Sequence, residues 1–364
     1  MRYKRFESSF AALRERSPIE IMRAGRGYVV IGDLRMGDGG KRDELEPLRG
    51  LVETVLSSWY LKRDFTLVLD GDTEDLRNFW LKDIRSAWPR LYGIFDRFAA
   101  KARLRKILGE RDLGLLRKPR YPYPLSHGLR LAGDGLELFI LHGHQAFRHF
   151  AGRDYRDFVT DYLENPRRIR DEGDTTDPDR VCRAEKRLYR GSVERGIVTI
   201  FGHSGRRLFE ARDEGESLRS LIERLLRESN FGYGDSPYTV DAMIKLYKER
   251  YREIERGGSA PLGLEEGEEG SPAPCLFNPG LGAGRRGMDA IELEEGTIRL
   301  VRWTRSGRQE AGSEAAAGEV RSLEGPSFVR LVQAEAELGG LAERIALFRP
   351  DRHRVEPVSS LEAP

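Results

Sequence analysis

The chain has 364 residues, of which 39% are hydrophobic and 34% are charged, and its 62 basic and 60 acidic side chains leave a net charge of +2. This near balance argues against a whole-molecule field for nucleic acid or an anionic membrane surface, so neither is an expected partner. Two cysteines, Cys182 and Cys275, cannot form a disulfide framework, and no signal peptide or transmembrane segment is visible, so we expect a cytoplasmic location.

Short apolar strands alternate with helices in the first part of the chain. Residues 1–24 have apolar positions at helical spacing and predict an amphipathic helix or pair of helices. A buried strand follows at 27–32, a helix at 44–61, and a second buried strand at 65–70. The order strand, helix, strand indicates a βαβ unit. A further helical region is expected over 76–100.

The middle of the chain continues this alternation. Strands are predicted at 103–108, 136–141 and 196–201, because each is a short apolar run bounded by turn residues. A charged and aromatic stretch at about 147–195 separates the last two strands and predicts a helical insertion over the edge of the sheet. Two helices, around 217–227 and 240–256, complete this part.

The last part predicts strands after an acidic loop. Residues 257–274 are rich in Gly, Glu and Pro, and strands return at 275–278, 289–293 and 297–303, the last two joined as a hairpin. Residues 304–364 predict a flexible, low-complexity tail with helical periodicity over 328–348. We therefore expect a single α/β domain over 1–303 followed by this tail.

A polar side chain follows each of the apolar strands at about 27–32, 65–70, 103–108, 136–141 and 196–201. In chain order these side chains are Asp33, Asp72, Glu110, His142 and His203. Sheets of this kind place ligand chemistry at the carboxyl ends of their strands. Carboxylate oxygens and imidazole nitrogens are ligands for divalent metals such as Mn, Fe or Zn. The pattern therefore predicts a metal site suited to phosphoester hydrolysis.

The order of these blocks resembles the calcineurin-like metallophosphoesterase family. Its members carry Asp-x-His, Gly-Asp, Gly-Asn-His/Arg-Asp, a His and Gly-His-x-His, each after a strand. The corresponding blocks here are Asp33-Leu34-Arg35, Gly71-Asp72, Gly109-Glu110-Arg111-Asp112, His142-Gly143-His144 and Gly202-His203-Ser204-Gly205. The resemblance covers roughly residues 28–303 and is to a divergent bacterial member. It implies an α/β fold of the metallophosphoesterase type, a β-sandwich flanked by helices.

Two departures from the family pattern bear on the number of metals. Arg35 stands where the family has a metal-binding His beside the first Asp, and Gly205 stands where the last His is expected. The resemblance therefore implies one complete metal site, formed by Asp72, Glu110, His142 and His203, and a second, incomplete site. The family ligands present in this chain are Asp33, Asp72, Glu110, His142 and His203.

The expected function is metal-dependent phosphoester hydrolysis at a reduced, single-metal site. Asp33 and Arg35 would orient the nucleophilic water or the phosphate, and Arg111 would stabilise developing charge. The substrate would be a phosphorylated small molecule or a lipid-linked nucleotide, because the Gly-x-Arg-Asp form is similar to the branch acting on a UDP-linked lipid A precursor. The alternative is a catalytically inactive member that binds a phosphorylated ligand or a protein partner. A nuclease is a weaker third reading, against which the near-zero net charge argues.

Overall fold

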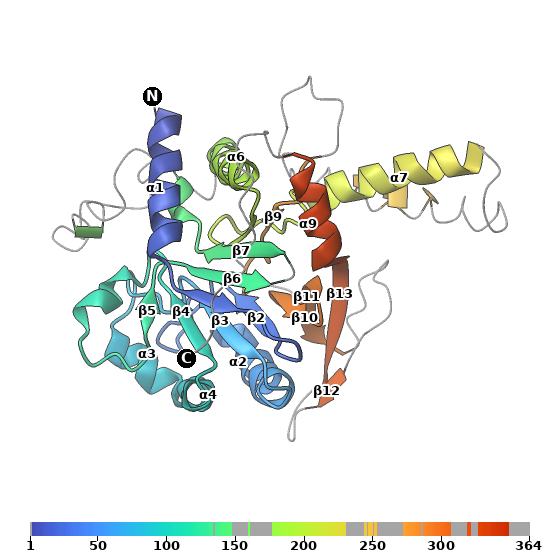
Figure 1. The fold of residues 1–364 in the computed structure, drawn as a ribbon. Coiled ribbons are helices and arrows are strands. Elements are labelled where there is room, and N and C mark those ends of the chain that lie inside the picture. The colour runs from blue at the N-terminus through green and yellow to red at the C-terminus, as the bar shows by residue number, and fades with distance from the viewer. Residues whose placement is uncertain are drawn as a thin grey trace.

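The structure, a computed structural model, shows a mixed α/β fold with two sheets and helices on their outer sides (Figure 1). It describes residues 2–133, 135–147, 159–160, 177–230, 244–245, 247–249, 251–252, 272–284, 287–306, 319–321 and 327–348. None of the helices in these ranges combines the length and apolar character that a membrane-spanning segment needs.

The larger sheet has eight strands, in the order β12-β13-β11-β10-β2-β3-β4-β5. Strands β2 to β5 are parallel to one another, and β10 to β13 pair antiparallel on the far side of β2. Their bounds are β2 Tyr28–Ile31, β3 Thr66–Asp70, β4 Leu104–Ile107, β5 Leu125–Ser126, β10 Met288–Glu294, β11 Thr297–Arg305, β12 Glu319–Arg321 and β13 Ser327–Glu337.

The smaller sheet has five strands, in the order β1-β6-β7-β8-β9. Only β6 and β7 are antiparallel, so β7, β8 and β9 end at the same edge. Their bounds are β1 Ile19–Ile21, β6 Leu129–Gly133, β7 Leu136–Leu141, β8 Val198–Phe201 and β9 Leu276–Phe277.

Helices cover both outer sides of the paired sheets, with α1 and α6 on one side and α2, α3 and α4 on the other (Figure 1). The α-helices are α1 Arg2–Arg16, α2 Arg49–Val55, α3 Leu81–Ala87, α4 Pro89–Ala100, α6 Pro178–Arg195, α7 Glu214–Asn230 and α9 Leu338–Ala346. Short 3-10 turns lie at η1 Glu46–Leu48, η3 Leu113–Arg117 and η4 His144–Ala146, and a π-helical turn, η2 Leu56–Tyr60, extends α2.

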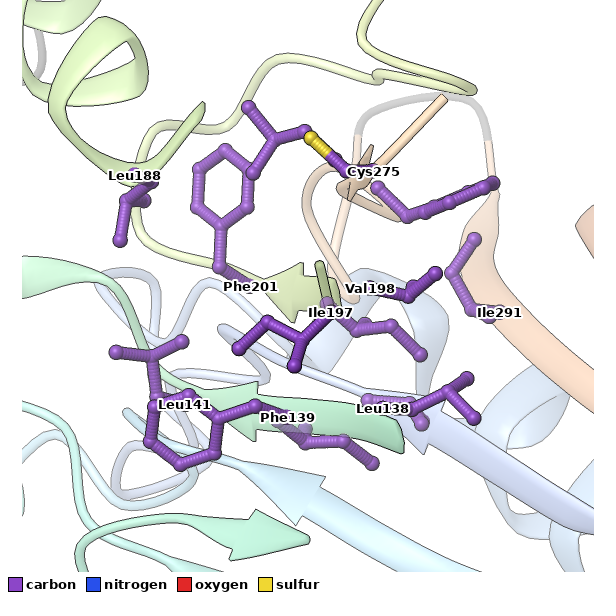
Figure 2. Close-up of a cluster of buried hydrophobic side chains, with 14 of the residues drawn as sticks. Leu138, Phe139, Leu141, Leu188, Ile197, Val198, Phe201, Cys275 and Ile291 are labelled. Carbon is purple, nitrogen blue, oxygen red and sulfur yellow. The ribbon is translucent and has the colours of Figure 1, made fainter. Parts of the chain in front are cut away.

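The core has two parts, because successive strand residues point to opposite faces. On β2, Val29 and Ile31 face the cluster that includes α2 and α4, whereas Tyr28 and Val30 face the cluster shared with the smaller sheet. Figure 2 shows part of this second cluster, where side chains of β7 and β8 meet Leu188 of α6. All three strands that precede the candidate ligands of the larger sheet are thus anchored on both faces.

The expected strands at 27–32, 65–70, 103–108, 136–141 and 196–201 are all present as β2, β3, β4, β7 and β8. So are the hairpin of β10 and β11 and the helices predicted at 44–61, 76–100 and 217–227, whereas most of the helix predicted at 240–256 lies outside the described residues. The predicted insertion at 147–195 is helical at α6, but 148–158 and 161–176 lie outside the described residues. The acidic loop at 257–274 also lies outside them, apart from 272–274.

Two predicted helices are partly wrong. Within the tail 304–364, residues 327–337 form the long strand β13 instead of the helix predicted over 328–348, and only the second half is helical, as α9. The Ala and Glu residues there favour a helix, but pairing along the whole of β11 overrides this local preference. Similarly, residues 1–24 contain one helix, α1, followed by β1, which pairs with β6.

Candidate metal centre

The predicted polar residues follow the carboxyl ends of strands in both sheets. Asp33, Asp72 and Glu110 come after the parallel neighbours β2, β3 and β4. His142 and His203 come after β7 and β8, which are parallel neighbours in the other sheet. Each sheet therefore presents its candidate ligands at one edge, and all five of these side chains are buried.

Four of the five side chains meet at one point. Asp72, Glu110, His142 and His203 each offer one ligand atom, and these atoms all lie within 4.8 Å of one another. Ligand atoms that share one ion at about 2.1 Å lie no more than about 4.2 Å apart. A small contraction would therefore bring all four into coordination distance, so the cluster could hold a metal ion.

Four polar atoms of this cluster have no well-aligned hydrogen bond within the described part of the chain, although they approach one another as two imidazole–carboxylate pairs, His203–Glu110 at 2.8 Å and His142–Asp72 at 3.3 Å. They are Asp72 Oδ2, Glu110 Oε2, His142 Nε2 and His203 Nδ1. Buried polar atoms in proteins are nearly always hydrogen-bonded, because an unsatisfied one is costly. Four such atoms around one point fit a cation that would satisfy all of them. Two carboxylates with two imidazoles suit Mn, Fe or Zn, and the structure does not distinguish these metals.

The backbone of β3 orients His142. Its Nδ1 atom lies 2.8 Å from the carbonyl oxygen of Asp70, which can only accept a hydrogen bond, so Nδ1 carries the hydrogen. The other ring nitrogen, Nε2, then faces Asp72 Oδ2 at 3.3 Å. Burial lowers the pKa of His142, but the nearby carboxylates, Asp72 first, outweigh burial and raise it well above its usual value.

Close packing around Asp72 explains two glycines of the motifs. Asp72 Oδ1 accepts a hydrogen bond from the backbone N–H of Arg111 at 2.8 Å. A β-carbon on Gly109 would lie 2.1 Å from that same Asp72 oxygen, and one on Gly71 would lie 2.4 Å from the His142 ring. Only glycine therefore lets these two loops approach so closely. The arrangement leaves Asp72 Oδ2 pointing into the cluster.

Several site residues hold an unfavourable backbone conformation. The φ angles of Asp33, Asp72 and His203 are 51°, 48° and 64°, in the left-handed region that side chains other than glycine rarely adopt. Such strain persists only where surrounding contacts enforce it, and it gathers at functional sites. Here each strained residue lies two positions after the end of a buried strand, which anchors the loop that carries it.

Asp33 lies beside the four-residue cluster, and other groups occupy its oxygens. Its Oδ2 accepts a hydrogen bond from the backbone N–H of His203 at 2.9 Å, and its Oδ1 accepts one from Arg35 Nη2 at 3.1 Å. Burial lowers the pKa of Arg35, but Asp33, Asp72 and Glu44 outweigh it and raise the pKa, so this guanidinium stays charged. A fixed cation thus stands next to Asp33, and Gly205 adds no ligand nearby.

Two more arginines border the four-residue cluster. Arg111 Nε lies 3.7 Å from Asp72 Oδ2, and its Nη1 hydrogen-bonds Asp75 Oδ2 at 3.2 Å. Arg77 Nη1 lies 3.7 Å from Glu110 Oε1. The side chains of Arg35, Arg77 and Arg111 are 15%, 20% and 17% exposed. Each can therefore also contact a molecule that binds from solvent. Sequence reasoning singled out Arg35 and Arg111 but missed Arg77, which no motif marks.

His144 and Asp70 also lie close to the cluster without belonging to its four residues. The His144 ring is 5.4 Å from that of His142, and burial, together with its two neighbouring histidines, lowers its pKa well below the usual value. Asp70 contributes its carbonyl, and burial raises the pKa of its carboxyl group to about 7. The role of the Asp70 carbonyl was missed because a backbone atom leaves no mark in a sequence.

Comparison with protein-family profiles finds no match for this chain, and a search of curated proteins finds none. The assignment of the metal centre therefore depends on its own geometry.

Proposed function

We propose that this chain is a metal-dependent phosphoester hydrolase of the calcineurin-like metallophosphoesterase type, with a single metal site. The observation that carries the proposal is the meeting of four buried potential ligand atoms, from Asp72, Glu110, His142 and His203, within 4.8 Å of one another. The layered arrangement of two mixed sheets with outer helices is compatible with the β-sandwich of that family.

The residues around the cluster suit a phosphoryl group. A divalent ion held there would polarise a phosphoryl oxygen and lower the pKa of water. Arg35, Arg77 and Arg111 would bind the remaining phosphate oxygens, since guanidinium groups form bidentate hydrogen bonds with phosphate. Asp33 is held by Arg35 and by the His203 backbone, so it would orient Arg35 toward the phosphate.

The arrangement supports one metal more strongly than two. A second ion would need Asp33 and a partner histidine, but Arg35 already binds Asp33 and no histidine stands at position 205. Arg35 would then supply positive charge where a second ion would supply both charge and a Lewis acid. We expect slower turnover than a two-metal clamp allows.

The contact between Arg35 and Asp33 also favours one alternative, a catalytically inactive member that binds a phosphorylated ligand. Arg35 neutralises Asp33, and the three arginines alone form an anion site. In that case phosphate would bind with the metal in place, and no phosphoester would be cleaved.

The test is hydrolysis of bis(p-nitrophenyl) phosphate by the full chain, after removal of metals and addition of Mn²⁺. We expect Mn²⁺-dependent turnover and one bound ion per chain, with both lost in Asp72→Asn. The matched control is Asp83→Asn, which changes a half-buried carboxylate on α3 outside the cluster and should behave as wild type. Metal binding without turnover would favour the inactive alternative, and a chain with neither bound metal nor turnover would refute the hydrolase.

A further inference from the structure

A second buried cluster of charges lies behind the metal centre. Lys106, at the end of β4, is fully buried and forms ion pairs with Glu74 Oε2 at 3.0 Å and with Asp112 Oδ2. Glu74 and Asp112 are also fully buried. Glu74 Oε1 accepts hydrogen bonds from Tyr121 at 2.7 Å and from Tyr92 at 3.1 Å. We call Lys106, Glu74 and Asp112 the rear ion cluster.

The rear ion cluster contacts the backbone of both loops that carry the acidic metal ligands. Asp112 Oδ1 accepts a hydrogen bond from the N–H of Gly109 at 2.7 Å, directly before Glu110. Asp112 Oδ2 accepts one from the N–H of Thr73 at 3.0 Å, directly after Asp72. One carboxylate therefore fixes the peptide units that adjoin two ligands from different strands.

The cross-link between the two loops is reciprocal. Asp112, in the loop after β4, binds an amide of the loop after β3. Asp72, in the loop after β3, binds the Arg111 amide in the loop after β4. The carboxylates of Asp72 and Asp112 thus each bind the backbone of the other loop. Lys106 fixes the orientation of Asp112, which is not a proposed metal ligand.

Stability alone does not account for this cluster. Apolar side chains of similar volume are commonly as stable as a buried ion pair, or more so, because burying charge is costly. What the charged groups add is a fixed direction for each hydrogen bond. Residues that orient metal ligands in this way commonly change metal affinity when they are replaced.

We infer that the rear ion cluster positions Asp72 and Glu110 for metal binding, with Asp112 acting through the Gly109 and Thr73 amides and Lys106 acting through Asp112. This inference rests on the proposed metal site. It assigns positioning roles to Lys106, Glu74 and Asp112, none of which touches the metal or the substrate.

The experiment measures Mn²⁺ affinity of the full chain by isothermal titration calorimetry in two variants. Asp112→Asn removes one acceptor of the cross-link and should weaken binding by about 10–100-fold. The double variant Lys106→Met, Glu74→Met removes one positive and one negative charge together, which protects the fold, and should weaken binding about tenfold.

Glu292→Gln is the matched control, because it breaks another buried ion pair, with Arg330. Glu292 pairs with Val29 near the start of β2, away from the strand end that carries Asp33. This variant should unfold at a lower temperature and bind Mn²⁺ as wild type does.

Hydrogen exchange of the metal-free protein provides a readout that a general loss of stability would not produce. Amides over 72–75 and 109–112 should exchange faster in Asp112→Asn than in wild type, whereas those of β10 and β11 should not change. In Glu292→Gln, the amides of β10 and β11 should exchange faster than in wild type, whereas those over 72–75 and 109–112 should not change.

Affinities within twofold of wild type in both site variants would overturn the inference. A wild-type chain that binds Mn²⁺ but cleaves no phosphoester would remove the proposed hydrolase function and leave the positioning roles open to the same affinity test. A wild-type chain that binds no Mn²⁺ would overturn both.

Discussion

His142 donates the hydrogen on Nδ1 to the backbone carbonyl of Asp70, 2.8 Å away, and this one contact decides which nitrogen faces the acidic ligands. A metal-binding histidine usually makes a hydrogen bond of this kind through its other ring nitrogen, because the bond fixes both the tautomer and the orientation of the ring. Strand β3 therefore ends in the carbonyl that orients one residue of the cluster, His142, and the loop that follows it carries another, Asp72.

We predict that His142→Ala abolishes tight Mn²⁺ binding, whereas His144→Ala does not. Both imidazoles are fully buried and their rings are neighbours, so the two variants remove similar volume from the same region. Only His142 has a nitrogen among the four clustered ligand atoms. Calorimetric titration measures the affinity directly. Equal losses in the two variants would mean that His144 is also a ligand, or that the region has collapsed in both.

Mn²⁺ binding should weaken as the pH falls. Burial lowers the pKa of His142, but Asp72 and the other carboxylates raise it well above the usual value, so Nε2 binds a second proton in the metal-free protein. A metal must displace this proton, and binding therefore releases it. Mn²⁺ affinity should rise with pH over the range 6 to 8. Calorimetric titrations in buffers of different ionisation enthalpy should confirm the release, because the buffer takes up the proton. A pH-independent affinity would exclude His142 as a ligand.

Arg35→Gln should weaken phosphate binding by about 10–100-fold, since a charge-assisted hydrogen bond contributes about 1.5–3 kcal/mol. Inhibition of hydrolysis by inorganic phosphate measures the effect, and direct phosphate titration of the Mn²⁺-loaded protein measures it if turnover is absent. Arg90→Gln is the control, because the Arg90 side chain is 73% exposed and pairs with Glu53 on another face. Mn²⁺ affinity should stay unchanged, because Arg35 is not a ligand. A second tight Mn²⁺ in Arg35→Gln would show that the arginine blocks a metal site.

The strand ends that carry the candidate metal centre could be predicted because two simple signals coincide there. Runs such as 65–70 are short, apolar and closed by glycine, and the next polar residue must then lie at the sheet edge. The convergence of two separate sheets at one point could not be derived from those signals. It came from the family resemblance, and the four clustered ligand atoms agree with it.

Other features carry no such local signal. Lys106 lies inside a strand, where a lysine usually points to solvent, and only the spatial position of Glu74 and Asp112 allows its burial. Strand β13 was missed because its Ala-Glu alternation also suits a helix, and the deciding partner, β11, is joined to it by a long connection. Both features arise where tertiary contacts override local preference.

The Glu185→Gln variant should become more stable than wild type as the pH rises from 4.5 to 7. Burial of Glu185 on α6 raises its pKa from 4.5 to about 7, although Arg206 opposes the shift. Between these values the unfolded chain loses the proton while the folded chain keeps it, so wild-type stability falls as pH rises and levels off above about 7. The full effect is about 3 kcal/mol, and glutamine removes it. Urea unfolding at several pH values measures the difference, with the exposed Glu343→Gln on α9 as control. A constant difference between Glu185→Gln and wild type across this range would show that Glu185 ionises normally in the folded protein.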